Sequence, residues 1–378
     1  MSKVLAFTRN RKRLVVYNEG ESLHTGTAEA GLRMHARTAG NRVLRGHGGA
    51  PTPVELMVSV VVPTCGRPEL LNRCVASLVL QKFDPDRFEI IVVDDRPSDA
   101  NRAVVERWAK HAADSGPEVI YIASPGPHGP AAARNRGWRA ARGDIIAFTD
   151  DDTIASPDWL ENGLRAFRGD VQAVWGRIVM PLSGTPTDYE KDATNLETAE
   201  FVTANCFCRR KMLENIDGFD ERFRFAWRED SDLYFRLLDF QAHIVHEPKA
   251  VITHPIRPAG WGVSLSQVKK IQFDALLFKK HPGRYREKIR ATPRWDFYLI
   301  VASIIAVIGG IATGAANVAM IAGAIWLIMT GHFCYQRLKN TSRSFSHVVE
   351  MIVTSVLIPP LAVYWRAVGA FKFRVGFI

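Results

Sequence analysis

The feature that most constrains the fold is a regular alternation of short apolar runs with stretches of helical spacing. The apolar runs are rich in Val and Ile and have the length of buried strands. The predicted strands are 58–62, 88–93, 119–122 and 144–148, and the predicted helices are 68–80, 103–113 and 130–142. Strands that alternate with helices at this spacing form βαβ units, so we expect an α/β fold with a mostly parallel sheet.

Polar residues stand at the ends of three predicted strands. They are Pro63 and Thr64 after the first strand, Asp94 and Asp95 after the second, and Asp150, Asp151 and Asp152 after the fourth. Ligands of parallel sheets bind outside the carboxyl ends of the strands. We therefore expect the three clusters to meet at one edge of the sheet and to form a binding site there.

The acidic triplet indicates a divalent metal. A buried strand that ends in three carboxylates needs a strong counter-charge, and hard cations prefer carboxylate oxygens. In an extended backbone, Asp150 and Asp152 lie on the same side. A metal held there could clamp a diphosphate, which favours nucleotide chemistry. The chain lacks a Gly-x-Gly-x-x-Gly after the first strand, which counts against a dinucleotide-binding dehydrogenase.

The C-terminal region is predicted to attach to a membrane. Residues 297–336 are forty positions without Asp, Glu, Lys or Arg. One helix of that length would be about 60 Å long, roughly twice a bilayer core, so a hairpin over about 297–333 that turns near 313–317 fits better. The apolar segment at about 348–366 contains Pro359-Pro360 and has basic flanks, which favours an interfacial or re-entrant segment over a third crossing.

Charge agrees with a membrane surface. The formal net charge is +10, and the excess lies in the N-terminal 53 residues and beside the apolar C-terminal region, including positions 269–290. We expect the basic C-terminal flank to contact anionic headgroups. No basic stripe with interleaved aromatic residues is present elsewhere, so nucleic acid is not an expected partner. We interpret residues 1–55 as a basic, partly disordered tail that carries a short hairpin from the apolar runs 4–7 and 14–17.

The location expected for the chain is the inner membrane, with the catalytic part on the cytoplasmic face. Five scattered cysteines fit a reducing compartment, and no uninterrupted apolar stretch of a secretory signal opens the chain.

Five motifs occur in an order that resembles a known family. They are Val-Ser-Val-Val-Val-Pro-Thr at 58–64, Ile-Val-Val-Asp-Asp at 91–95, Ala-Arg-Asn-Arg-Gly at 133–137, Phe-Thr-Asp-Asp-Asp at 148–152 and Arg-Glu-Asp-Ser-Asp-Leu at 228–233. The chain thus resembles the GT-A fold glycosyltransferases of family 2, which invert the anomeric centre. The resemblance covers about 56–260 and implies a Rossmann-like GT-A domain over 56–292, followed by a membrane region over 293–378.

The resemblance also implies roles for single residues. Asp150 and Asp152 match the metal-binding motif, with Mn²⁺ or Mg²⁺ as the cofactor and His254 as a further ligand. Residues that would bind the nucleotide sugar are Pro63, Thr64, Arg67, Asp94, Asp95, Arg134, Asn135 and Asp151. Asp230 matches the catalytic base, with Glu229 and Asp232 in the same motif.

The expected reaction is metal-dependent transfer of one sugar from a nucleotide-diphosphate sugar, with UDP as the expected nucleotide. The acceptor would be a hydroxyl of a lipid or lipid-linked saccharide at the membrane. The sequence Arg-Pro-Ala-Gly-Trp at 257–261 differs from the Gln-x-x-Arg-Trp of the processive polymerases, which favours a single transfer. Two alternatives stay open: a polyprenyl-phosphate glycosyltransferase, whose acceptor needs no base, and a non-catalytic scaffold that binds nucleotide sugar.

Overall fold

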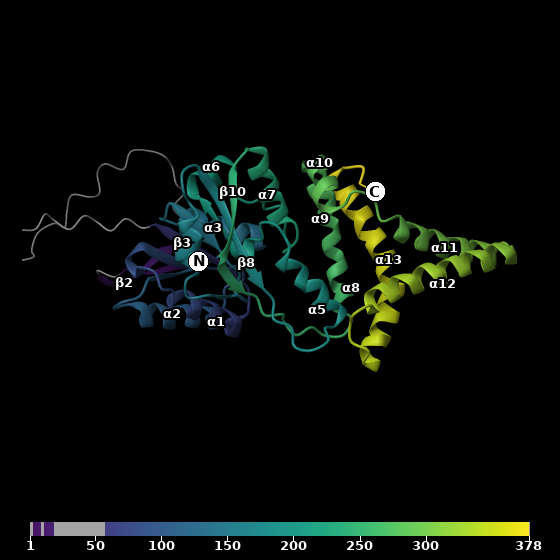
Figure 1. Ribbon diagram of the computed structural model, residues 1–378, viewed down its shortest axis with the longest axis horizontal. Helices are drawn as coiled ribbons and strands as arrows, with labels where there is room; N and C mark the ends of the chain where they lie inside the picture. Colours follow the sequence, from purple (N-terminus) through teal and green to yellow (C-terminus); the bar gives the residue numbers. More distant parts are fainter. Residues whose placement is uncertain (1–2, 9–10, 19–56, 378) are drawn as a thin grey trace, which may run out of the picture.

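The computed structural model describes residues 3–8, 11–18 and 57–377 of the 378-residue chain. The described strands form one mixed ten-stranded sheet in the order β2-β1-β5-β4-β3-β6-β9-β8-β10-β7 (Figure 1). Their bounds are β1 Lys3–Thr8, β2 Arg11–Asn18, β3 Val58–Thr64, β4 Phe88–Asp94, β5 Glu118–Ala123, β6 Ile145–Phe148, β7 Ile154–Ala155, β8 Val171–Val179, β9 Cys206–Arg209 and β10 His243–Thr253.

Helices flank the sheet and then continue into the C-terminal region. They are α1 Pro68–Val79, α2 Asp99–Ala112, α3 Pro130–Ala140, α4 Trp159–Arg165, α5 Asp188–Ala193, α6 Arg210–Asn215, α7 Glu229–Asp239, α8 Val263–Gln267, α9 Gln272–Lys280, α10 Pro282–Arg284, α11 Trp295–Ala312, α12 Ala316–Leu338 and α13 Phe345–Phe373. Short 3-10 or π turns connect several of them: η1 Pro85–Arg87, η2 Thr194–Glu197, η3 Thr203–Asn205, η4 Val268–Ile271 and η5 Tyr285–Ile289.

The centre of the sheet is parallel, and helices cover both of its faces. Strands β5, β4, β3 and β6 pair in parallel, and every residue of β3 and β4 is buried. Successive side chains of a strand point to opposite faces. Val60 accordingly joins a core with α1 and α2, whereas Val61 joins a second core with α3. A strand buried on both faces needs a continuous apolar run, which is why 58–62 and 88–93 were recognisable in the sequence.

Strands β1 and β2 form an antiparallel hairpin, and β1 extends the sheet by pairing with β5, where Leu5 lies opposite Tyr121. A hairpin is therefore present at the two apolar runs of the N-terminal tail. The disorder predicted for the rest of that tail concerns residues 19–55, which lie outside the described residues.

The second half of the sheet is mixed. β9 runs antiparallel to both β6 and β8, and β10 pairs with β8 in parallel. At its end, β10 also pairs with the short strand β7, with Thr253 opposite Ile154. This pairing carries the residues after β10 to the same edge of the sheet at which β6 ends.

Three C-terminal helices, α11, α12 and α13, are long and apolar enough to cross a membrane. Figure 1 shows α11 and α12 as a hairpin that projects away from the sheet, whereas α13 runs across the base of that hairpin. At 1.5 Å per residue, α11 is about 27 Å long, close to the thickness of a bilayer core. Apolar side chains on the hairpin are widely exposed, for example Ile311, Met320 and Leu327. The C-terminal region thus has the form of a membrane attachment.

Helix α13 is continuous through Pro359 and Pro360 and does not break into a re-entrant pair. It packs on α9 and η4 on one side and contacts α11 and α12 on the other. The helix therefore lies between the sheet and the apolar hairpin.

Candidate active site

The carboxyl ends of β3, β4 and β6 meet, as the strand order requires. Thr64 lies opposite Asp94 in the register of β3 and β4. The Thr64 hydroxyl donates a hydrogen bond of 2.6 Å to Asp151 Oδ2, which links the end of β3 to the turn after β6. Two polar clusters that are 87 residues apart in the sequence are thus in direct contact.

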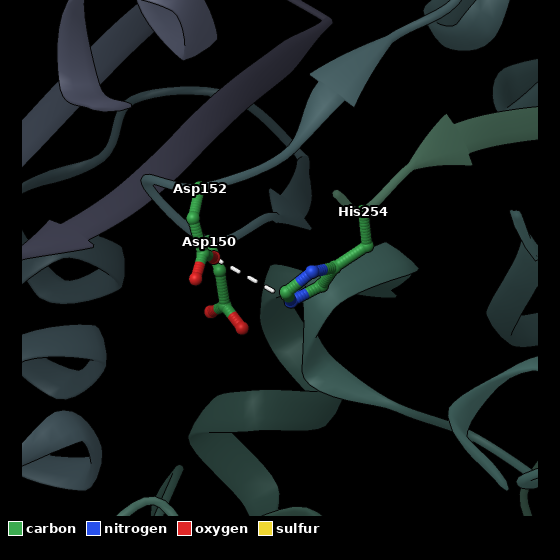
Figure 2. A group of neighbouring side chains, drawn as sticks. All are labelled: Asp150, Asp152 and His254. Carbon is green, nitrogen blue, oxygen red and sulfur yellow. Dashed lines mark ion pairs between the residues drawn. The ribbon is translucent and has the colours of Figure 1, made fainter. Parts of the chain in front are cut away.

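Asp150, Asp152 and His254 form a cluster suited to a cation. One possible ligand atom from each residue lies within 4.8 Å of the others. Figure 2 shows the His254 ring reaching from the end of β10 toward the two carboxylates, with Nε2 3.5 Å from Asp152 Oδ1. The backbone N–H of His254 donates to Val179 O, which fixes the residue at the edge of β8. The buried Nδ1 atom of His254 has no hydrogen-bond partner among the described residues. Two carboxylates and an imidazole are a donor set that fits Mn²⁺ or Mg²⁺.

Three arginines compensate the charge of the triplet. Arg67 contacts Asp151 at 2.7 Å and Asp152 at 3.6 Å, and Arg257 Nε lies 3.1 Å from Asp152 Oδ2. Arg134, which is buried in α3, donates to Asp150 at 2.7 Å. Cations at this edge also suit a diphosphate, since arginine binds phosphate oxygens through its planar fork.

The surroundings give neighbouring acids of the triplet different pKa values. Burial raises the pKa of Asp151 to about 6, although Arg67 and the Thr64 hydroxyl act in the opposite direction. Burial would also raise the pKa of Asp150, but the charges of Arg134, His254 and Arg67 outweigh it and lower that pKa. Asp150 is therefore held as a carboxylate, the form that can bind a cation.

A second acidic pair, Glu229 and Asp230, opens helix α7 beside the triplet. Arg134 joins the two groups, because its second guanidinium nitrogen donates to Glu229 Oε1 at 3.1 Å. Burial and the charge of Asp230 raise the pKa of Glu229 to about 7, although Arg134 opposes the shift. The Asp230 carboxylate is half-buried and accepts hydrogen bonds only from its neighbour Ser231, with no ion pair in the described part of the chain. The Asp230 carboxylate is therefore available to accept a proton.

A family model described as "Glycosyl transferase family 2" matches residues 59–227. Residues 59–227 are a family 2 glycosyltransferase domain. The match spans β3 to the residue before Arg228, so it covers the acidic triplet but ends just before the Glu229-Asp230 pair. The predicted family and enzyme class are thereby confirmed.

Curated relatives carry glycosyltransferase names. Glycosyltransferase AglE of Haloferax volcanii is 26% identical over 215 residues, which cover 54% of this chain and 68% of the relative. Pre-mycofactocin glycosyltransferase of Mycobacterium tuberculosis is 32% identical over 216 residues, which cover 53% of this chain and 43% of the relative. The chain thus spans about two thirds of the first relative and less than half of the second.

The fold class is confirmed by a solved structure. The mannosyltransferase PcManGT from Pyrobaculum calidifontis, in complex with GDP-Man and Mn²⁺, superposes with a TM-score of 0.52 at 19% identity, over 84% of this chain and 89% of that one. The family 2 domain of this chain therefore has the GT-A architecture.

Within the family 2 domain, Asp94 and Asp95 are partly engaged by the protein. Asp94 Oδ2 accepts from Ser98 N, Asn101 Nδ2 and the Tyr121 hydroxyl, whereas Asp94 Oδ1 is buried without a partner among the described residues. Burial raises the pKa of Asp94. Asp95 accepts from the backbone N–H of Gly129.

Gly129 has φ 129°, and a Cβ there would meet the Arg224 backbone at 2.9 Å, so the turn before α3 requires glycine. Pro63 is buried near the end of β3 and sets the backbone of that edge.

Two predicted residues do not join the site. Asn135 uses both ends of its amide to hold the backbone of Phe219, and it also contacts Glu221 and Trp138. It is therefore a brace between α3 and the loop before α7.

Asp232 is fully buried on another face of α7. Its carboxylate binds Arg236 at 2.9 Å, Lys280 at 2.6 Å and His281 at 3.1 Å, so it fastens α7 to α9. Residues two apart on a helix lie about 200° apart, which explains why Asp230 and Asp232 do not point the same way.

The sequence did not predict two contacts that hold the start of α7. Arg228, just before the acidic pair, has a left-handed backbone with φ 75° and binds Asp274 of α9 at 2.7 Å. Trp227 donates to the same carboxylate at 2.9 Å, so both residues brace the start of α7.

Lys270, counted with the basic flank in the sequence, lies close enough to Glu229 and Arg257 to interact with their charges. Burial lowers the pKa of Lys270. In the sequence, Lys270 was only one member of a basic cluster, and that pattern did not indicate that it lies near Glu229.

Proposed function

We propose that the chain is a membrane-attached, metal-dependent, inverting glycosyltransferase that moves one sugar from a nucleotide-diphosphate sugar to a hydroxyl group. The observation that carries this proposal is the position of Arg134. Its guanidinium bridges Asp150 of the metal cluster and Glu229, the sequence neighbour of Asp230, so the start of α7 is tied to the metal cluster. A cation site beside an available carboxylate is the arrangement that such a transfer needs.

Asp150, Asp152 and His254 would hold Mn²⁺ or Mg²⁺, which when bound stabilises the negative charge of the leaving diphosphate. The protein adds its own cations. Arg67 is partly exposed beside the triplet and can reach a phosphate oxygen, Arg257 pairs with Asp152, and Lys270 lies near Glu229. The unpartnered Asp94 Oδ1 can accept a hydrogen bond from a nucleotide base or ribose.

Asp230 would be the general base. Its carboxylate takes the proton of the acceptor hydroxyl as that oxygen attacks the anomeric carbon, and the bond from this carbon to the diphosphate oxygen breaks. Attack opposite the leaving group inverts the anomeric centre. Glu229, with its pKa near 7, orients Arg134 and gives the base a neighbour that is partly protonated at neutral pH.

The acceptor would be carried by the membrane, either as a lipid or as a lipid-linked saccharide. The apolar hairpin α11–α12 fixes the domain to the bilayer, and α13 would lie along the interface. Five free cysteines support a catalytic domain in the cytoplasm, where nucleotide sugars are available, at the inner membrane. A UDP-sugar remains our predicted donor, and the GDP-Man in the solved mannosyltransferase makes a GDP-sugar the first competitor to test.

The test uses detergent-purified protein with UDP-, GDP- and dTDP-sugars, with and without Mn²⁺ or Mg²⁺, in the presence of a membrane lipid extract. We expect release of nucleoside diphosphate that requires the metal, one donor and the extract. Wild-type protein that binds a donor with metal but does not cleave it under any condition would support the scaffold alternative instead. Protein that binds no donor would contradict both.

The Asp230→Asn variant separates the two enzymatic alternatives. A hydroxyl acceptor needs the base, so transfer should fall by about a thousandfold while donor affinity stays within about twofold of the wild type. An ionised phosphate acceptor needs no base, so retained turnover in this variant would favour a polyprenyl-phosphate glycosyltransferase.

A further inference from the structure

A cavity of about 310 Å³ lies at the junction between the sheet and the membrane helices. Its walls come from the first turn of α5, from loop 256–263 and from the first turns of α13. Figure 1 shows α5 and α8 beside the lower part of α13, where these segments meet. None of the predicted site residues lines this cavity.

Arg337, at the end of α12, gives the cavity a rigid wall. The side chain is 8% exposed and binds Asp188 of α5 at 2.8 Å. It also donates to the hydroxyls of Thr354 and Ser355 on α13. A buried arginine with these three partners ties α5, α12 and α13 together, and its charge is already compensated by Asp188. Specific contacts therefore fix this wall of the cavity.

His347, on the first turn of α13, is the unusual group of the cavity. The residue is 5% exposed, and neither ring nitrogen has a hydrogen-bond partner among the described residues. Glu350 Oε2 lies 4.0 Å from Nδ1. Glu350, which also lines the cavity, accepts from the backbone N–H of Gly262 at 2.8 Å through Oε1. Buried polar groups are nearly always hydrogen-bonded, so His347 is poised for a ligand.

The cavity adjoins the metal cluster on one side and the membrane on the other. Arg257 lines the cavity and also binds Asp152 at 3.1 Å. Met351 lines the cavity from α13, whose other side contacts the apolar hairpin. A molecule in the cavity would therefore lie between the acids at the end of β6 and the bilayer surface.

We propose that this cavity is the subsite for the carbohydrate headgroup of a membrane-borne acceptor, an inference that rests on the proposed function. Imidazole, carboxylate and the Tyr189 hydroxyl are partners for neutral hydroxyl groups. A phosphate is a poor fit, because Glu350 would repel it and both cavity arginines are held by aspartates. The charges and the polar lining thus favour a polyhydroxyl group.

The experiment measures transfer to a chloroform–methanol extract of the source membranes by the wild type and by the Glu350→Gln and His347→Phe variants. Glu350→Gln preserves the bond from Gly262, since an amide oxygen can accept it, and removes only the charge. We expect the half-saturating concentration of extract to rise by about tenfold in both variants, while the donor dissociation constant with Mn²⁺ stays within about twofold. Glu214→Gln, an exposed glutamate outside the cavity, is the matched control and should change neither quantity.

The possible results are distinct. Wild-type protein without metal-dependent donor binding would contradict the proposed function itself. Normal donor binding with an unchanged half-saturating concentration of extract in both variants would overturn the subsite. Farnesyl phosphate serves as a phosphate probe, and a variant that loses transfer to this probe would mean that the cavity binds an anion instead. Equal use of the water-soluble saccharides released from the extract by mild acid would show that the subsite recognises the sugar without its lipid.

Discussion

Arg134 has a consequential position, because its buried side chain pairs with both the partly exposed Asp150 and the buried Glu229. Its side chain is 3% exposed, and its partners Asp150 and Glu229 come from two different elements. Removing one member of such a group leaves an uncompensated buried charge, which is much more costly than losing a surface pair.

Replacing Arg134 by Met is expected to destabilise the protein by about 3–5 kcal/mol, because Asp150 and Glu229 would lose their shared cation. The measurement is the thermal unfolding midpoint in detergent. Arg139→Met is the matched control on the same helix, since the half-exposed Arg139 pairs with Asp217 and Glu221 at the surface. Equal midpoints for the two variants would contradict the bridging role.

The raised pKa of Glu229 predicts a pH dependence of stability. A folded-state pKa of about 7 lies above the ordinary value of 4.5, so the protonated acid stabilises the fold. This contribution is complete below about pH 4.5 and is lost as the pH rises through about 7, a change on the order of 3 kcal/mol. Glu229→Gln imitates the protonated acid, so its stability should lack this pH-dependent change.

The quantity to compare is the difference in unfolding midpoint between Glu229→Gln and the wild type, followed from about pH 5 to pH 8. We expect the unfolding midpoint of the variant to increase relative to that of the wild type as the pH rises. A difference that is constant over this range would mean that Glu229 titrates normally.

At the scale of elements, α13 is the helix whose placement matters most. It runs across the base of the α11–α12 hairpin and contacts the sheet side through α9 and η4. If the hairpin crosses the bilayer, α13 lies in the interface plane, and its two ends are at the same depth.

Spin labels at Ile352→Cys and Tyr364→Cys test this placement, because both positions are exposed and are twelve residues apart. An interfacial helix should give equal depths in vesicles, whereas a crossing helix would separate the two labels by about 18 Å. Cys65 and Cys334, which are not buried, are replaced first. A label at Ile308→Cys on α11 provides the deep reference.

Some of these elements could be predicted from the sequence, and others could not. The parallel core was predictable, because β3 and β4 are buried on both faces and therefore read as continuous apolar runs. The pairing of β10 with β8 and β7 was not, since it joins segments far apart in the sequence, and His254 reaches the acids only through it. Asp232 was grouped with Asp230 by the motif, but the helical turn of α7 places the two acids on different faces.

At the scale of the whole molecule, α13 connects the apolar hairpin α11–α12 to the sheet domain that carries the acidic residues. A site attached to the bilayer experiences acceptor at its surface concentration, which exceeds the bulk concentration. Water-soluble donor gains nothing from this attachment.

We therefore expect transfer to the lipid extract to be about tenfold more efficient in vesicles than in micelles at the same bulk amounts, with donor affinity unchanged. The measurement compares initial rates of nucleoside diphosphate release in the two preparations. Equal rates would indicate that the acceptor reaches the site from water.

Helix α13 contacts the apolar hairpin α11–α12 with one side and lines the cavity with His347, Glu350 and Met351 of another. The height at which chemistry occurs above the membrane is then set by the width of a single helix, about 10 Å. In the proposed membrane-attached enzyme, a hydroxyl would be glycosylated only if its carrier presents it at that height above the bilayer. The sugar just added moves the new chain end above that level, so we expect the product to be released after one addition.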